Sequence, residues 1–104
     1  MIHATAAVEA HTVVARVRTL ADEWARQRPE RQRRRELDPS DFAQLRAAGF
    51  YLACLPTEQG GLWEDRARST RLICDLLRTL ASADSSVALV SAMHPAVLVP
   101  FFGR

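Results

Sequence analysis

Two stripes of apolar residues recur at helical spacing, and they constrain the fold more than any other feature of the chain. The first stripe comprises Val13, Val17, Leu20 and Trp24, and the second comprises Leu72, Ile73, Leu76, Leu77 and Leu80. Side chains at these spacings share one face of an α-helix, which completes a turn every 3.6 residues. No segment shows the alternation of a half-buried strand. The stripes predict helices over residues 7–27 and 64–82 in an all-α, antiparallel arrangement of about four helices.

Capping residues predict where the other helices begin and end. Asp38 followed by Pro39 is typical of a helix start, and Gly49 is typical of a helix end. We expect residues 50–56 to be extended or irregular and the Gly60-Gly61 pair to form a turn. Asp84 is expected to cap a last helix. Residues 87–93 have no polar face, which predicts burial on all sides, and Pro95 should kink or end that helix.

Length and charge exclude several classes of protein. The 104 residues allow one small domain, and a net charge of +2 is too small to indicate nucleic-acid binding. All 14 basic residues are Arg, which indicates a GC-rich genome and lowers the weight of any single Arg. The apolar run 87–102 is interrupted and shorter than the ~20 residues of a spanning helix, so no membrane span is expected. Residues 1–10 lack the features of a signal peptide, and Cys54 and Cys74 do not form a disulfide framework, which favours a cytoplasmic protein.

No catalytic or metal-binding constellation is evident from the residue pattern. Residues 31–36 are expected to form a charged connection. The Arg residues in and before it favour a solvated linker, with a basic patch for phosphates as the alternative; they are Arg26, Arg28, Arg31, Arg33, Arg34 and Arg35. His3, His11 and His94 lack partners at ligand spacing, so no metal site is predicted. Glu58 and Glu64 lie in or beside a turn, and we assign neither as a catalytic base. The sequence therefore predicts no catalytic residue.

The order of the helix-capping, turn and apolar segments along the chain resembles that of a known family. Leu45-Arg46-Ala47-Ala48-Gly49-Phe50 is followed by Leu55-Pro56-Thr57-Glu58-Gln59-Gly60-Gly61-Leu62, then by the second stripe, and then by Ala83-Asp84-Ser85-Ser86-Val87-Ala88-Leu89-Val90 and His94-Pro95. This order is similar to that of the N-terminal helical domain of the flavin-dependent acyl-CoA dehydrogenases, and the resemblance covers residues 37–101. It implies an N-terminal helix and charged linker over 1–36 and a domain core over 37–104. The apolar residues 97–102 lead us to expect that this core is truncated.

The resemblance also implies an activity. The complete protein would use FAD to remove hydrogens from the α and β carbons of an acyl thioester, with acyl-CoA as substrate and a homotetramer as the assembly. The base and the flavin-contacting loop lie in other domains of that family, so this chain alone should be inactive and should not bind FAD tightly. Its matching last helix would line the acyl pocket with Ser86, Val87 and Val90, with His94 near the pocket mouth. Position 82 is Ser, where a family member that acts on a dicarboxylyl-CoA would have Arg, so an acidic acyl substrate is not expected. Ser82, Ser86 and Val90 are expected on one helix face, and their alternative roles are helix capping by the two serines and core packing by Val90.

Two other functions stay open at this point. Flavin-dependent monooxygenases have the same fold and a similar N-terminal domain, although their flavin reacts with oxygen. A non-enzymatic helical module could instead bind a partner through the helix after Asp84 or through the Arg run.

Overall fold

The computed structural model describes the backbone of residues 2–102 and the side chains of residues 10–93. Over this range the chain is all-α, as predicted, and its strand-like pairing is confined to an isolated bridge between Pro56 and Trp63. The α-helices are α1 (Ile2–Arg26), α2 (Arg28–Gln32), α3 (Pro39–Ala48), α4 (Arg66–Ala83) and α5 (Ser85–Phe102). Two 3-10 turns, η1 (Phe50–Cys54) and η2 (Thr57–Gln59), connect α3 to α4.

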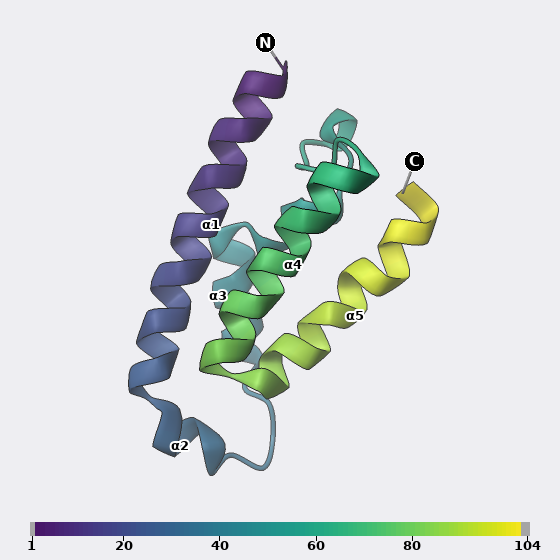
Figure 1. Cartoon of the computed structure of the whole chain (residues 1–104). Helices are drawn as coiled ribbons and strands as arrows, with labels where there is room; N and C mark the ends of the chain where they lie inside the picture. The colour runs from purple at the N-terminus through teal and green to yellow at the C-terminus, as the bar shows by residue number, and fades with distance from the viewer. Residues whose placement is uncertain (1, 103–104) are drawn as a thin grey trace.

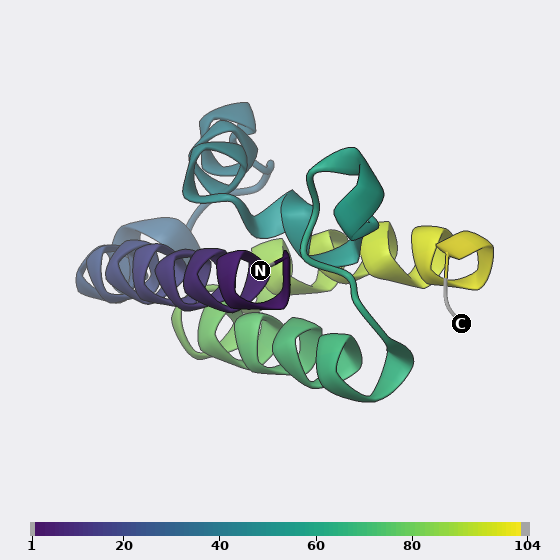
Figure 2. The same cartoon turned by 90° about the horizontal axis from the view of Figure 1, so that it is seen from above.

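The long helices α1 and α4 lie side by side and run in the same direction (Figures 1 and 2). The antiparallel arrangement expected from the sequence therefore does not hold for this pair. The chain crosses at the lower end of Figure 1 through α2 and returns upward through α3, so that α4 begins beside the start of α1. Helix α5 then runs back along α4 in the opposite direction. The intervening α3 and η segments make the parallel pairing possible.

The two apolar stripes form the centre of the core, as predicted. Helix α1 buries Val13, Val17 and Trp24, while Leu20 is only partly buried. Helix α4 contributes Leu76 and Leu80 among the most deeply buried side chains, and both helices belong to one apolar cluster. Removal of this apolar surface from water is the main force that holds the helices together.

Both predicted ends of α3 are confirmed. The Asp38 carboxylate accepts a hydrogen bond from the Ser40 N–H at 2.9 Å, which satisfies one of the unpaired amides of the first helical turn. The hydrogen bonds from Ser40 lower the pKa of Asp38. At the other end Gly49 has a φ of 90°, in the left-handed region that glycine adopts readily.

Residues 50–63 form a compact loop, and of the segment 50–56 that was expected to be extended or irregular only Leu55 and Pro56 are extended. The segment η1 is a 3-10 turn, after which the chain folds back on itself. The Leu62 N–H donates to the Leu52 carbonyl and the Trp63 N–H donates to the Leu55 carbonyl, each at 2.8 Å. Leu62 and Trp63 are buried in the core. The predicted turn at Gly60-Gly61 is confirmed, and Gly60 has a φ of 81°.

Replacing Gly61 with alanine should destabilise the chain more than the same change at Gly60. A Cβ at Gly61 would lie 2.1 Å from the Leu55 carbonyl oxygen, so backbone must move, whereas a Cβ at Gly60 meets nothing within 4 Å. We expect a loss of about 3 kcal/mol or more for Gly61→Ala from overpacking, and about 1 kcal/mol for Gly60→Ala from its left-handed φ. Urea unfolding of both variants measures the difference. Equal losses would mean that the loop relaxes around the added methyl group.

Helix α5 begins where the sequence predicts but is not buried on all sides. The Asp84 carboxylate accepts from the Val87 N–H at 3.1 Å and caps the helix. Val87, Ala88 and Ser91 are buried against α4 and η1, whereas Leu89 and Met93 are 73% and 61% exposed. The helix packs on one side only within the described residues, which explains the difference. Of the two outcomes expected at Pro95, a kink or an end of the helix, the end is wrong, because α5 continues to Phe102. Among the described helices, none is long and apolar enough to cross a membrane.

The two cysteines have opposite environments. Cys54 is buried, its thiol donates to the Tyr51 carbonyl oxygen at 3.7 Å, and burial raises its pKa to about 11. Cys74 is exposed on α4. Both are free thiols.

We therefore expect a thiol reagent at neutral pH to modify Cys74 quickly and Cys54 slowly, because only the thiolate reacts and the Cys54 thiolate is suppressed. The measurement is the number of thiols titrated before and after unfolding in denaturant. In a Cys74→Ser control the fast phase should disappear. A second fast thiol in the folded protein would show that η1 opens readily.

Candidate functional site at the start of α5

Arg31 forms a buried ionic cluster at the end of the bundle where α5 begins. Its side chain is 2% exposed, and it donates from Nη2 to Asp41 Oδ2 at 2.6 Å and from Nη1 to Asp41 Oδ1 at 3.2 Å. Its Nε donates to Asp84 Oδ2 at 3.0 Å, and its guanidinium lies over the Trp24 ring at 4.2 Å from the centroid. These contacts use the planar fork that distinguishes Arg from Lys. One side chain on α2 thus contacts α1, α3 and the cap of α5.

Asp84 has two roles in this cluster. One oxygen of its carboxylate accepts from the Val87 N–H and the other accepts from Arg31. The cap of α5 is therefore bonded directly to α2, and through Arg31 to Asp41 on α3. The first turn of α5 is thus linked to Arg31 through a single carboxylate.

The cluster corrects the expectation that residues 31–36 are a solvated connection. Arg31 lies in α2 and is buried, and Arg34 donates to Asp41 at 3.2 Å. Arg33 and Arg35 are exposed, as expected for a solvated segment. The sequence gives only a weak signal for the burial of Arg31. Trp24 lies seven residues before it, but the acidic partners Asp41 and Asp84 are distant in sequence.

Burial raises the pKa of Asp41, and the guanidinium groups of Arg31 and Arg34 oppose this rise. A raised pKa means that the folded chain holds this proton more tightly than the unfolded chain. The contribution of Asp41 therefore favours folding at acid pH and is lost as the pH rises through the folded-state pKa. The buried carboxylate is tolerated at neutral pH because two cations face it.

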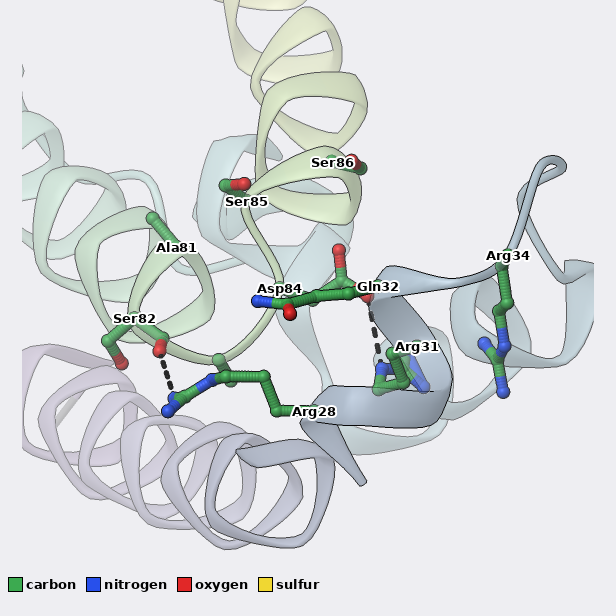
Figure 3. Close-up of a pocket in the computed structure, with 10 residues that line it drawn as sticks. Arg28, Arg31, Gln32, Arg34, Ala81, Ser82, Asp84, Ser85 and Ser86 are labelled. Carbon is green, nitrogen blue, oxygen red and sulfur yellow. Dashed lines mark hydrogen bonds and ion pairs between the residues drawn. The ribbon is translucent and has the colours of Figure 1, made fainter. Parts of the chain in front are cut away.

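Two pockets flank the cluster. The first has a volume of about 390 Å³ and is lined by Arg28, Arg31, Arg34, Ser85 and Ser86 among others. Figure 3 shows Arg28 reaching the Ser82 carbonyl, to which it donates at 2.7 Å, and Arg31 directed at Asp84. This pocket is polar. The hydrogen bond from Arg28 connects α2 to the end of α4, next to the bond by which Arg31 connects α2 to the cap of α5.

The second pocket, here called the α5 groove, has a volume of about 270 Å³ and lies between residues 34–38 and the start of α5. Three of the predicted site residues, Ser86, Val87 and Val90, line it, together with the apolar side chains of Leu37 and Leu89. His94 lies outside the residues whose side chains are described. Ser82 is not on the predicted shared face, because it belongs to α4, whereas Ser86 and Val90 belong to α5 and line the groove.

The α5 groove combines apolar and charged side chains. Its apolar side chains are Leu37 on the wall formed by residues 34–38 and Val87, Leu89 and Val90 on α5, while the carboxylates of Asp41 and Asp84 are held by Arg31. Its volume lies just below the roughly 300–1,000 Å³ of typical ligand pockets, which fits an alkyl chain better than a dinucleotide. The described residues contain no group of His, Cys, Asp and Glu side chains that could hold a metal ion.

Comparison of the chain with protein-family models, curated proteins and solved structures gave no match. The groove brings together three residues, Ser86, Val87 and Val90, that the sequence had singled out.

Proposed function

We propose that this chain is the N-terminal part of an FAD-dependent, acyl-CoA dehydrogenase-like oxidoreductase. In this proposal the chain supplies one wall of the acyl pocket, and FAD, the base and the tetramer contacts belong to other parts of the complete protein. The chain alone is then inactive, and its cytoplasmic location is part of the proposal. The motif order from Leu45 to Pro95 supports it, and the observed all-α fold is compatible with it.

The observation that carries the proposal is the apolar wall of the α5 groove. Val87 and Val90 lie one helical turn apart on α5, and Leu37 lines the same groove from the other side. Ser86 lines it close to the helix start, where residues of this kind would contact the acyl chain. Leu37 on one wall and Val90 and Leu89 on the other give the groove an apolar side suited to an alkyl chain, while Arg34, Arg35, Glu36 and Asp38 line the rest of it.

The first test is to translate the DNA that follows the Arg104 codon in all three frames. The proposal expects a β-rich segment and then a helical segment with a catalytic Glu. The encoded protein should then carry the visible absorbance of oxidised flavin, and anaerobic addition of an acyl-CoA should bleach it. Bleaching only by a nicotinamide-dependent reductant would favour the monooxygenase alternative. Absence of both downstream segments in every frame would contradict the enzyme proposal.

A partner-binding module is the second candidate, favoured by the outer face of α5. Leu89 and Met93 are largely exposed and Val90 is 42% exposed, which makes an apolar surface beside the groove. Another protein could cover this surface. Affinity capture on the intact gene product, compared with a Leu89→Ser, Met93→Ser variant, tests this candidate. A stoichiometric partner lost in the variant would support it, and equal capture by both proteins would contradict it.

A further inference from the structure

The two walls of the α5 groove meet at the Arg31 cluster. One wall is the connection over residues 34–38, and the other is the first turns of α5. Arg31 lies at the base between them and bonds both to Asp41 at the start of α3 and to Asp84 at the cap of α5. Among the described side chains, Arg31 is the one that hydrogen-bonds to both Asp41, which follows the first wall, and Asp84, which precedes the second.

We propose that Arg31 is a positioning residue that fixes the separation of the two groove walls. Its Nε contact sets the place of Asp84, and Asp84 in turn holds the Val87 N–H, so the pocket-lining turn of α5 is linked to Arg31 through one carboxylate. Its paired contact with Asp41 sets the start of α3 and hence the preceding residues Leu37 and Asp38. The importance of this separation for an acyl ligand rests on the proposed function, but the separation itself does not.

The chemistry of the cluster favours a positioning role over a purely stabilising one. A buried ion pair is weak support for stability, because desolvation offsets much of the attraction. Its value lies in geometry, since each hydrogen bond of the guanidinium fork is directional and the Trp24 ring holds the plane of the fork. Trp24 is itself fixed, because its Nε1 donates to Gln44 Oε1 at 3.1 Å. The fork therefore cannot turn to satisfy one carboxylate without losing the other.

The test measures the groove directly with two spin labels. In a Cys74→Ser background, labels are attached at Arg35→Cys and Leu89→Cys, which lie on opposite walls, while Cys54 stays buried. The decisive variant is Asp84→Ser, because serine caps a helix as well as aspartate but cannot pair with Arg31. The second variant is Arg31→Lys, which keeps the charge but loses the fork. Electron paramagnetic resonance then gives the distribution of label separations.

We expect a single narrow distribution in the reference protein and an at least about twofold broader one in both variants, as when a second arrangement becomes populated. Circular dichroism of the same samples checks that the helices persist. An Arg33→Lys control, in the same segment but exposed, should match the reference. A narrow, unshifted distribution in Asp84→Ser would overturn the proposal even if Arg31→Lys fails to fold. The outcome does not depend on acyl-CoA or FAD, so it is separate from the fate of the proposed function.

Discussion

Replacing Arg31 with methionine is expected to lower the free energy of unfolding by about 3–5 kcal/mol, because the change leaves buried charge without its partner. Asp41 is 4% exposed at its side chain and would retain only the contact from Arg34, and Asp84 would lose its guanidinium. A small domain has about 5–15 kcal/mol of stability, so this loss would unfold a measurable part of the population. Urea unfolding followed by circular dichroism gives the value.

A second substitution separates lost attraction from uncompensated charge. Arg31→Met combined with Asp41→Leu should recover part of the loss, since apolar groups of similar size can replace a buried pair nearly without penalty. Arg33→Met is the matched control, and as an exposed residue it should change stability by no more than about 0.5 kcal/mol. A loss below about 1 kcal/mol for Arg31→Met would contradict the central role of the cluster.

The ionic cluster illustrates what the sequence could not predict. Local rules correctly predicted both apolar stripes, the Asp38 and Asp84 caps and the Gly49 helix end, because each depends on neighbours within a few residues. The burial of Arg31 depends on Asp41 and Asp84, and Asp84 lies 53 residues away along the chain. A run of Arg residues gives no sign of which member will be buried. Only the tertiary arrangement distinguishes Arg31 from Arg33.

The parallel pairing of α1 and α4 was hidden for a similar reason. Short connections favour antiparallel neighbours, but here α2, α3 and two 3-10 turns intervene between the two helices (Figure 1). The residues of the compact loop are stabilised by bonds such as Leu62 to Leu52, which span ten residues and leave no periodic pattern. Ser86, Val87 and Val90 are close in sequence and lie together at the start of α5, and their role in an acyl pocket stays a prediction.

Residues 87–93 show the limit of composition as a guide to burial. An apolar segment without a polar face was expected to be enclosed, yet the described part of the chain covers only the side of α5 that faces α4 and η1. Val87 and Val90 look alike in the sequence but differ sharply in the fold, at 1% and 42% exposed. The expectation that Val90 is buried is therefore wrong. Val87 and Val90 therefore form a matched pair, of the same residue type in the same helix, for a test of how burial affects stability.

Val87→Asp is expected to lose about 3–5 kcal/mol of unfolding free energy, because it places an unpaired carboxylate in the core beside Asp84. Val90→Asp should lose less than about 1 kcal/mol, since its carboxylate can reach water from the groove. The pair holds residue type, helix and charge constant and varies only burial. Urea unfolding of both variants and of the unaltered chain, at one pH and salt concentration, measures the difference. If Val90→Asp unfolds the chain as fully as Val87→Asp, the outer face of α5 is covered in the folded protein, and a partner or a second copy must be sought there.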